Sequence, residues 1–244
     1  MKASRLEYRL RFTIFAIIYI LGFVAPWDAV WHLDGHGINS HVWGTLAWSM
    51  AKSGLSIGAA FNVLLAFGTM CALLGAWLRT WGTAYLGSGV VLDGGMHGNG
   101  VLTDGPFRYV RNPLYLGTWF NTLALALLMP PSGAIFTVLC IGLLTMRLIL
   151  AEEAFLATRL GAPYLAYCAE VSRLLPALRP RVEASGVEPH WRNAVLAELF
   201  VWGVAVSFIA VGWRYNEVLL LQGVLVSLGV SLVARAFSPR QQTA

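Results

Sequence analysis

Six apolar runs, separated by polar segments of very different length, constrain the fold of this 244-residue chain more than any other feature. An α-helix needs about 20 mostly apolar residues to cross a bilayer, and a composition of 57% hydrophobic and 12% charged residues lies outside the soluble range. We therefore predict an all-α fold, a polytopic transmembrane helix bundle that forms one membrane domain over residues 1–244. The first and third expected spans are short, and seven spans is the main alternative to six. The expected spans cover residues 12–27, 55–78, 114–130, 132–150, 193–213 and 217–235.

The distribution of lysine and arginine predicts the orientation of these spans. If the amino terminus is cytoplasmic, only Lys52 and Arg214 of the 17 basic residues lie on the outer side, which satisfies the positive-inside rule. Both termini and the segments 79–112 and 151–192 are then cytoplasmic. The first run ends in A-P-W-D, unlike the cleavage site of a signal peptide, so we expect it to be retained as the first helix.

The net charge of +5 is explained by contact with anionic lipid head groups, and no pattern of basic and aromatic residues favours nucleic acid. Membrane lipids are the expected partners, and nothing in the sequence indicates an oligomeric state. No metal is expected, because the spacing of His32, His36 and His41 matches no familiar ligand motif. The loop that holds these histidines is rich in tryptophan, so its stretch 41–51 predicts a short helix in the outer interface. The three widely spaced cysteines indicate neither a disulfide nor a zinc framework.

The sequence P-P-S-G at 130–133 predicts a tight outer turn between the third and fourth runs, because proline cannot continue a helix and glycine permits unusual backbone angles. The two runs should then pack as an antiparallel hairpin. This hairpin would bring residues 108–115, at its entrance, beside residues 147–153, at its exit. Charged residues are costly in hydrocarbon, so their concentration in these two stretches predicts one polar pocket on the cytoplasmic side.

The stretch 102–117 reads L-T-D-G-P-F-R-Y-V-R-N-P-L-Y-L-G. It resembles the signature of the isoprenylcysteine carboxyl methyltransferase and phospholipid methyltransferase superfamily of integral membrane methyltransferases, roughly G-P-Y-R-Y-V-R-H-P-x-Y-x-G. Further elements similar to that family follow: the pair Glu152-Glu153, then L-G-A-P-Y-L-A-Y at 160–167, then V-x-R-x-x-P at 171–176. The resemblance covers about residues 60–180, which we expect to form a methyltransferase-like core.

The resemblance implies S-adenosylmethionine as the methyl donor and a hydrophobic or lipid-like acceptor that enters from the bilayer. The donor carries a carboxylate, an amino group, a sulfonium and an adenine, so it needs cations, anions and an apolar slot together. Arginines of the first motif suit the carboxylate, the paired glutamates the amino group, and Tyr109 or Tyr115 the adenine. The catalytic residues are expected to be Arg111, Asn112 and Glu153. The expected cofactor-binding residues are Arg108, Tyr109, Arg111, Asn112, Pro113, Tyr115, Glu152 and Glu153.

One position departs from the family pattern. The usual histidine is Asn112 here, and an asparagine forms hydrogen bonds but does not titrate near neutral pH. Any role that requires an ionisable imidazole is therefore lost at this position. Phe107 in place of the usual tyrosine removes one hydroxyl.

Three further side chains carry alternative interpretations. Tyr164 and Tyr167 fit interfacial anchors as well as they fit site residues. Glu198 fits a favourable charge at the amino end of the fifth span better than it fits a substrate-binding group.

Two other functions remain open. Membrane sterol reductases, which use a reduced nicotinamide cofactor, share an R-x-P-x-Y-like turn, but the paired glutamates and the element at 161–167 argue against them. A degenerate, non-enzymatic membrane scaffold or lipid-binding protein would explain Asn112. No residue discriminates between oxygen, nitrogen and sulfur nucleophiles, so a prenylcysteine carboxylate, a phospholipid amine and a small thiol are all possible acceptors.

Overall fold

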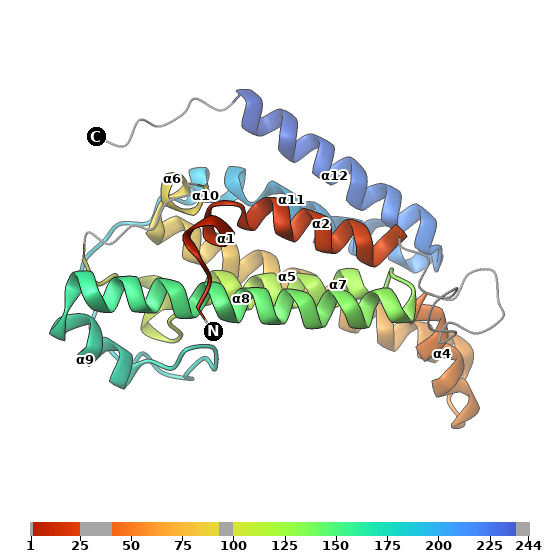
Figure 1. The fold of residues 1–244 in the computed structure, drawn as a ribbon. Helices are drawn as coiled ribbons and strands as arrows, with labels where there is room; N and C mark the ends of the chain where they lie inside the picture. Colours follow the sequence, from red (N-terminus) through yellow and green to blue (C-terminus); the bar gives the residue numbers. More distant parts are fainter. Residues whose placement is uncertain (1, 25–40, 93–99, 238–244) are drawn as a thin grey trace.

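The computed structural model describes residues 2–24, 41–92 and 100–237. The fold is all-helical, with 78% helix and no strand in this part of the chain, which confirms the predicted fold class (Figure 1). Short 3-10 helices, η1 (Gly105–Arg108) and η2 (Gly212–Arg214), interrupt the α-helices. The α-helices are α1 (Arg5–Arg9), α2 (Arg11–Val24), α4 (Val42–Lys52), α5 (Ile57–Leu86), α6 (Ser88–Leu92), α7 (Pro113–Ala126), α8 (Pro131–Leu160), α9 (Ala162–Glu170), α10 (Trp191–Ala197), α11 (Leu199–Val211) and α12 (Glu217–Phe237).

Three of the described helices, α5, α8 and α12, are long and apolar enough to cross a membrane. The pair α10 and α11, which is bent by 71° at Glu198, would make a fourth span if it is counted as one. The helix α2 is apolar but shorter, and α7 has 14 residues. Each of the six predicted runs is mostly helical over its described residues, whereas length and composition support three or four spans. The six-span count and the cytoplasmic termini stay predictions.

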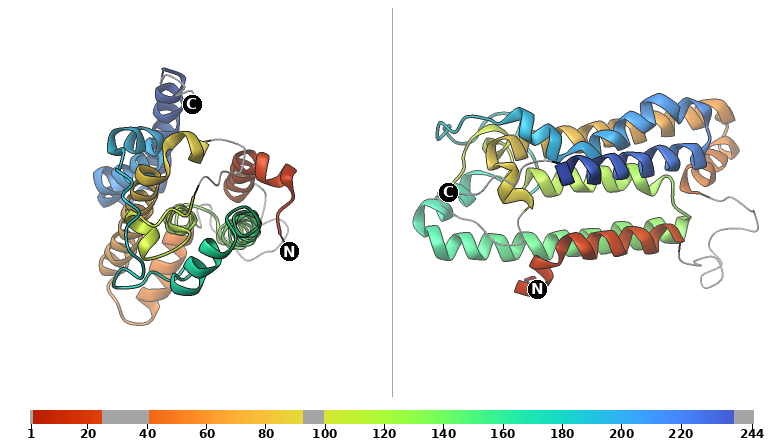
Figure 2. Two further views of the ribbon diagram at one scale, coloured as in Figure 1. Left: turned by 90° about the vertical axis from the view of Figure 1, so that its left-hand side faces the viewer. Right: turned by 90° about the horizontal axis from the view of Figure 1, so that it is seen from above.

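The helices α7 and α8 form the predicted hairpin, with residues 127–130 between them. On its other side α7 packs along α5, and the two backbones meet at glycines. A Cβ atom on Gly75 would lie 2.8 Å from the carbonyl oxygen of Gly117, and one on Gly117 would lie 2.9 Å from that of Gly75. Because real Cβ atoms do not approach this closely, the crossing requires a glycine on each helix. The helix α11 packs on α5, and α2 lies along α8 (Figure 2).

Different helices lie at the two ends of the bundle. The helix α4 and the turn of the hairpin lie at one end, and α6 and α9 lie at the other (Figure 1). The structure confirms a helix where 41–51 was predicted, and its Trp43 is fully buried against Phe61 and Phe208. Its position in the outer interface stays a prediction. His41 directly precedes α4, whereas His32 and His36 lie outside the described residues.

Two helices continue past the predicted ends of their spans. The helix α5 extends beyond residue 78 to Leu86, and α8 extends beyond residue 150 to Leu160. The additional turns carry Arg79 and Glu153, which form ion pairs within the protein, and Glu152, which accepts hydrogen bonds from tyrosine hydroxyls. Hydropathy marks the end of an apolar run, and these helices end later because protein partners replace water around their polar side chains.

Candidate active site

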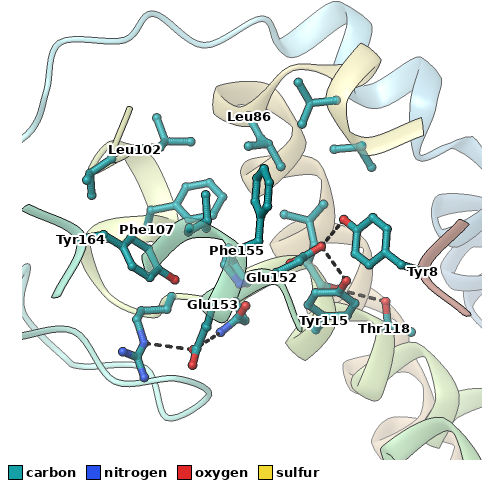
Figure 3. Close-up of a pocket in the computed structure, with 18 of the residues that line it drawn as sticks. Tyr8, Leu86, Leu102, Phe107, Tyr115, Thr118, Glu152, Glu153, Phe155 and Tyr164 are labelled. Atoms are coloured by element: carbon teal, nitrogen blue, oxygen red, sulfur yellow. Dashed lines mark hydrogen bonds and ion pairs between the residues drawn. The ribbon is translucent and has the colours of Figure 1, made fainter. Parts of the chain in front are cut away.

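A cavity lies among α2, α5, α7, α8 and α9, at the end of the bundle that carries α6 and α9 (Figure 3). Aromatic and aliphatic side chains make up much of its wall, including those of Phe12, Phe15, Leu86, Phe107 and Phe155. An apolar wall with a few convergent polar groups is typical of a small-molecule site. The polar groups that line it are Tyr8, Arg11, Arg79, Arg111, Asn112, Tyr115, Thr118, Glu152, Glu153, Tyr164 and Tyr167.

The carboxylate of Glu153 on α8 is the centre of one polar cluster. The Arg173 guanidinium donates to it from Nε at 3.1 Å and from a terminal nitrogen at 2.7 Å. Arg111 forms a looser ion pair with it, with Nε 3.5 Å from Oε1. The Asn112 amide donates to Glu153 at 3.4 Å and to the carbonyl oxygen of Arg173 at 3.2 Å. The three predicted catalytic residues, Arg111, Asn112 and Glu153, therefore lie together.

Arg111 and Asn112 are held in place by their position in the chain. Asn112 is the residue before α7, and Pro113 occupies the first helical position, where its missing N–H needs no partner. The Asn112 side chain makes no capping bond to α7, so it is directed to Glu153 instead. The Arg111 backbone N–H donates to the Ser172 carbonyl at 2.9 Å, and a terminal guanidinium nitrogen donates to the Cys168 carbonyl at 3.1 Å.

The neighbouring Glu152 is the centre of a second polar cluster. Its Oε1 accepts a hydrogen bond from the Tyr115 hydroxyl at 2.9 Å and another from the Tyr8 hydroxyl. Figure 3 shows Glu152 directed toward these two tyrosines and Glu153 directed away from them. Asn112, directly before α7, contacts Glu153, and Tyr115 on α7 contacts Glu152, so the hairpin joins motifs about forty residues apart.

The N-terminal segment contributes residues that the sequence analysis did not place in the site. A Ser4–Glu7 capping box starts α1 and directs Tyr8 to the cavity. Arg11 is 5% exposed, donates to the carbonyl oxygens of Tyr8 and Val91, and lies over the rings of Tyr8 and Phe12. The S-x-x-E pattern at 4–7 was a readable signal for the helix, but no local pattern indicates that the helix folds back onto α8.

Arg79, which is partly buried, and Glu198, which is buried, form an ion pair beside the cavity. The Arg79 guanidinium donates to the two carboxylate oxygens of Glu198 at 2.7 and 3.0 Å and to the Thr118 hydroxyl at 2.8 Å. The Thr83 hydroxyl donates to the same carboxylate at 2.9 Å. Glu198 stands at the break between α10 and α11, near the position expected from sequence, and pairs with a side chain that lines the cavity.

Two predicted cofactor-binding residues lie outside the cavity wall and anchor the segment that follows α9. Arg108 donates from Nε to the Val182 carbonyl at 3.0 Å, and its own carbonyl accepts from the backbone of Arg181. The Tyr109 carbonyl accepts from the Ala177 backbone, and its ring lies 5.8 Å from that of Trp81. The other predicted residues, including Pro113, line the cavity.

Tyr164 and Tyr167 on α9 both face the cavity, and Tyr167 donates to the Phe107 carbonyl at 2.8 Å. Burial raises the pKa of each phenol well above its ordinary value, so both stay neutral near pH 7. Burial also acts to raise the pKa of Asp104, but hydrogen bonds from the Ser185 hydroxyl and nearby backbone outweigh it and hold this pKa below its usual value. This ionised Asp104 ties the start of η1 to the same downstream segment.

The comparison with known families agrees with this geometry. A family model described as phospholipid methyltransferase matches residues 63–162, from within α5 to the start of α9. Over these residues the chain is similar to that family, which lies within the superfamily of isoprenylcysteine and phospholipid membrane methyltransferases. No curated protein and no solved structure matches the chain. The matched region contains the two glutamates and Arg111, whereas Tyr8, Arg11 and Arg173 lie outside it.

Proposed function

We propose that this protein is an integral membrane methyltransferase that uses S-adenosylmethionine to methylate a hydrophobic or lipid-like acceptor. The observation that carries this proposal is the convergence of Arg111, Asn112 and Glu153 in an apolar cavity built largely by the family-matched region. The amino-acid part of the donor is a zwitterion, and this cluster contains both charges that such a group requires.

The contacts of Arg111 support an exchange of partners when the donor binds. Its Nε is buried and has no hydrogen-bond partner among the described residues, and its distance of 3.5 Å from Glu153 leaves the pair loose. A bound carboxylate can take the guanidinium, and a bound ammonium can take the glutamate, with both charges staying compensated. Arg173 adds a second cation to the same cluster, and it belongs to the V-x-R-x-x-P element of the sequence.

The reaction needs alignment more than it needs an activated enzyme group. The sulfonium already activates the methyl carbon, so in-line displacement is accelerated mainly by holding the acceptor in line and excluding water. The apolar wall around Phe107, Phe155 and Tyr164 suits the adenine ring and keeps water out. Arg108 and Tyr109 would act through the segment they anchor.

Calorimetric titration of the full-length protein with S-adenosylmethionine tests the donor. Arg111→Ala or Glu153→Ala should weaken binding by about 1.5–3 kcal/mol, the usual contribution of a charge-assisted hydrogen bond. Glu170→Ala, at an exposed glutamate on α9, is the matched control and should leave affinity unchanged. Unchanged affinity in folded variants of both site residues would refute the assignment. Binding of a reduced nicotinamide cofactor instead would favour the sterol-reductase alternative.

Asn112 tests whether the chain has kept activity. Because Asn112 contacts Glu153 and the Arg173 carbonyl, Asn112→Ala should lower donor affinity or turnover. Asn112→His should be tolerated, since the surrounding turn matches the family pattern. If the wild type binds no donor and Asn112→His restores binding, the protein is a degenerate scaffold.

The proposal places the active site on the cytoplasmic side of the membrane, as the charge distribution indicates. Single cysteines near Gly98 and Gln242, in a background without the three native cysteines, should react only with a reagent supplied from the cytoplasm. Labelling of either position from outside would overturn this orientation and the six-span topology.

A further inference from the structure

The two neighbouring glutamates of α8 have different surroundings. Glu153 is paired with guanidinium groups, whereas the hydrogen bonds to Glu152 come from the neutral hydroxyls of Tyr8 and Tyr115. A carboxylate held by cations accepts a proton less readily than one held by neutral hydroxyls. Of the two, Glu152 is therefore the better proton acceptor, which leaves Glu153 alone for the amino group of the donor in place of the pair expected from sequence.

Glu152 also retains room for another partner. A carboxylate offers about four acceptor positions, and the two tyrosines donate to the same oxygen, Oε1. The residue lines the cavity together with Phe12 and Phe15 of α2, which give this part of the cavity an apolar wall. A hydrogen-bond donor on an amphiphilic molecule could thus reach Glu152 while its apolar part contacts α2.

The N-terminal segment is positioned to hold Tyr8 at this point. Arg147, on the same helix as Glu152, donates to both carboxylate oxygens of Glu7 at 2.9 Å, and its carbonyl accepts from the Ala3 backbone at 3.0 Å. These contacts fix the residues on either side of Ser4 against α8. The Tyr8 hydroxyl therefore comes from outside the family-matched region to complete the surroundings of Glu152.

We propose that Glu152 accepts the proton that the methyl acceptor loses, and that Tyr8 is a positioning residue for its carboxylate. This inference rests on the proposed function and narrows the acceptor class. It requires an exchangeable proton on the nucleophilic atom, as in a thiol or a protonated amine, and it excludes a carboxylate as the preferred acceptor.

The lone pair of the acceptor nitrogen or sulfur forms a bond to the methyl carbon, while the carbon–sulfur bond of the sulfonium breaks and its electrons leave sulfur as a neutral thioether. One acceptor proton moves to Glu152 and is released to water after the product leaves. A protonated amine must lose this proton before it attacks, because an ammonium nitrogen has no lone pair.

The test uses the full-length protein in detergent micelles with methyl-labelled S-adenosylmethionine. Dodecylamine, dodecanethiol and dodecanoate serve as probes with one alkyl chain and three head groups. Glu152→Gln should lower turnover of the amine and the thiol by about 100-fold or more, while donor affinity stays within about threefold of wild type. Tyr8→Phe should lower their turnover by about tenfold with unchanged donor affinity.

Tyr19→Phe is the matched control for Tyr8→Phe. Tyr19 lies in the same N-terminal segment and shares a hydrogen bond of 2.6 Å with Thr122, but it does not line the cavity. Its replacement should leave the turnover of each probe unchanged. If Glu152→Gln fails to fold, the turnover of Tyr8→Phe is compared with that of Tyr19→Phe. Equal turnover in these two variants would overturn the proposal.

Several results would overturn the inference while leaving the proposed function intact. These are near wild-type turnover in Glu152→Gln, loss of donor binding in that variant, or a clear preference for dodecanoate. If the wild type methylates none of the probes, a total lipid extract replaces them: a base-labile methyl ester as product overturns the inference, and a stable N-methyl or S-methyl product supports it. A wild type that binds no donor refutes the proposed function itself.

Discussion

The N-terminal and C-terminal segments both lie outside the family-matched region, yet they are joined to it in different ways. The ion pair of the C-terminal segment joins Glu198, whose side chain is 3% exposed, to Arg79, whose side chain is 19% exposed, and Thr83 also donates to Glu198. The ion pair of the N-terminal segment joins Glu7 and Arg147, whose side chains are 33% and 28% exposed. Breaking a buried ion pair leaves an uncompensated charge, whereas water replaces the partner of an exposed one. We therefore expect the C-terminal segment to be a fixed support on one side of the cavity. The N-terminal segment is expected to be a more weakly held wall on the other side.

The largest effect is expected at the buried pair. Glu198→Ala should lower the free energy of unfolding by about 3 kcal/mol, the lower end for a broken buried pair, because Arg79 keeps its bond to Thr118. Unfolding in mixed micelles, followed by circular dichroism, measures the loss. Arg79→Met in the same chain should recover much of it, since no unpaired charge then remains. A loss below about 1 kcal/mol for Glu198→Ala would show that the support is not fixed.

A smaller, local effect is expected at Arg11. Arg11→Met removes the hydrogen bonds to the carbonyls of Tyr8 and Val91 at 3.1 and 3.2 Å, which should loosen the N-terminal wall by about 1.4 kcal/mol. Trypsin should then cleave after the exposed Arg5 and Arg9 about tenfold faster. Cleavage after the exposed Arg181 is the internal control and should not change. If Arg11→Met lowered the free energy of global unfolding as much as Glu198→Ala does, the two segments would not differ in how firmly they are held.

The smallest effect is expected at Glu7. Hydrogen bonds from Arg147 and Ser4 lower its pKa to about 2 from an ordinary 4.5. Since the folded pKa lies below the unfolded one, the contribution of Glu7 is complete above about pH 4.5 and is lost as the pH falls toward 2. Cleavage of the N-terminal segment by pepsin should therefore rise over this window in the wild type. Glu7→Gln should show no such rise attributable to this pair, and a rise of equal size in the variant would exclude Glu7 as its cause.

Much of the fold could be predicted from sequence because lipid demands long apolar helices. The positions of α5, α8 and α12 follow from hydropathy, and the P-P-S-G turn predicted the hairpin that joins the two motifs. The break of the fifth run at Glu198 could not be predicted, because the partner of this glutamate, Arg79, is more than a hundred residues earlier in the chain.

In the candidate site, too, some features could be predicted from the sequence and others could not. The pairing of Arg111, Asn112 and Glu153 followed from a local motif and a hairpin, whereas Tyr8 and Arg11 reach the cavity through tertiary contacts. From sequence, Arg11 was only one of the basic residues assigned to the cytoplasmic side. Residues that a motif places together can be read from the chain, but a segment that folds back onto a distant helix leaves no periodic signal of its partner.

The glycine crossing between α5 and α7 makes these helices one mechanical unit. Their backbones touch at Gly75 and Gly117, and Arg79 lies about one turn further along α5. A bilayer that thickens or thins changes the tilt of a helix more readily than it separates backbones in contact. We expect α5 and α7 to tilt together as one rigid body, so that the cavity keeps its shape. In Gly75→Ala a methyl group separates α5 from α7. The turnover measured in vesicles of short-chain and of long-chain phosphatidylcholine should therefore differ less for the wild type than for this variant. Tolerance of different membrane thicknesses would thus depend on Gly75 and Gly117, each of which has only a hydrogen atom in place of a side chain.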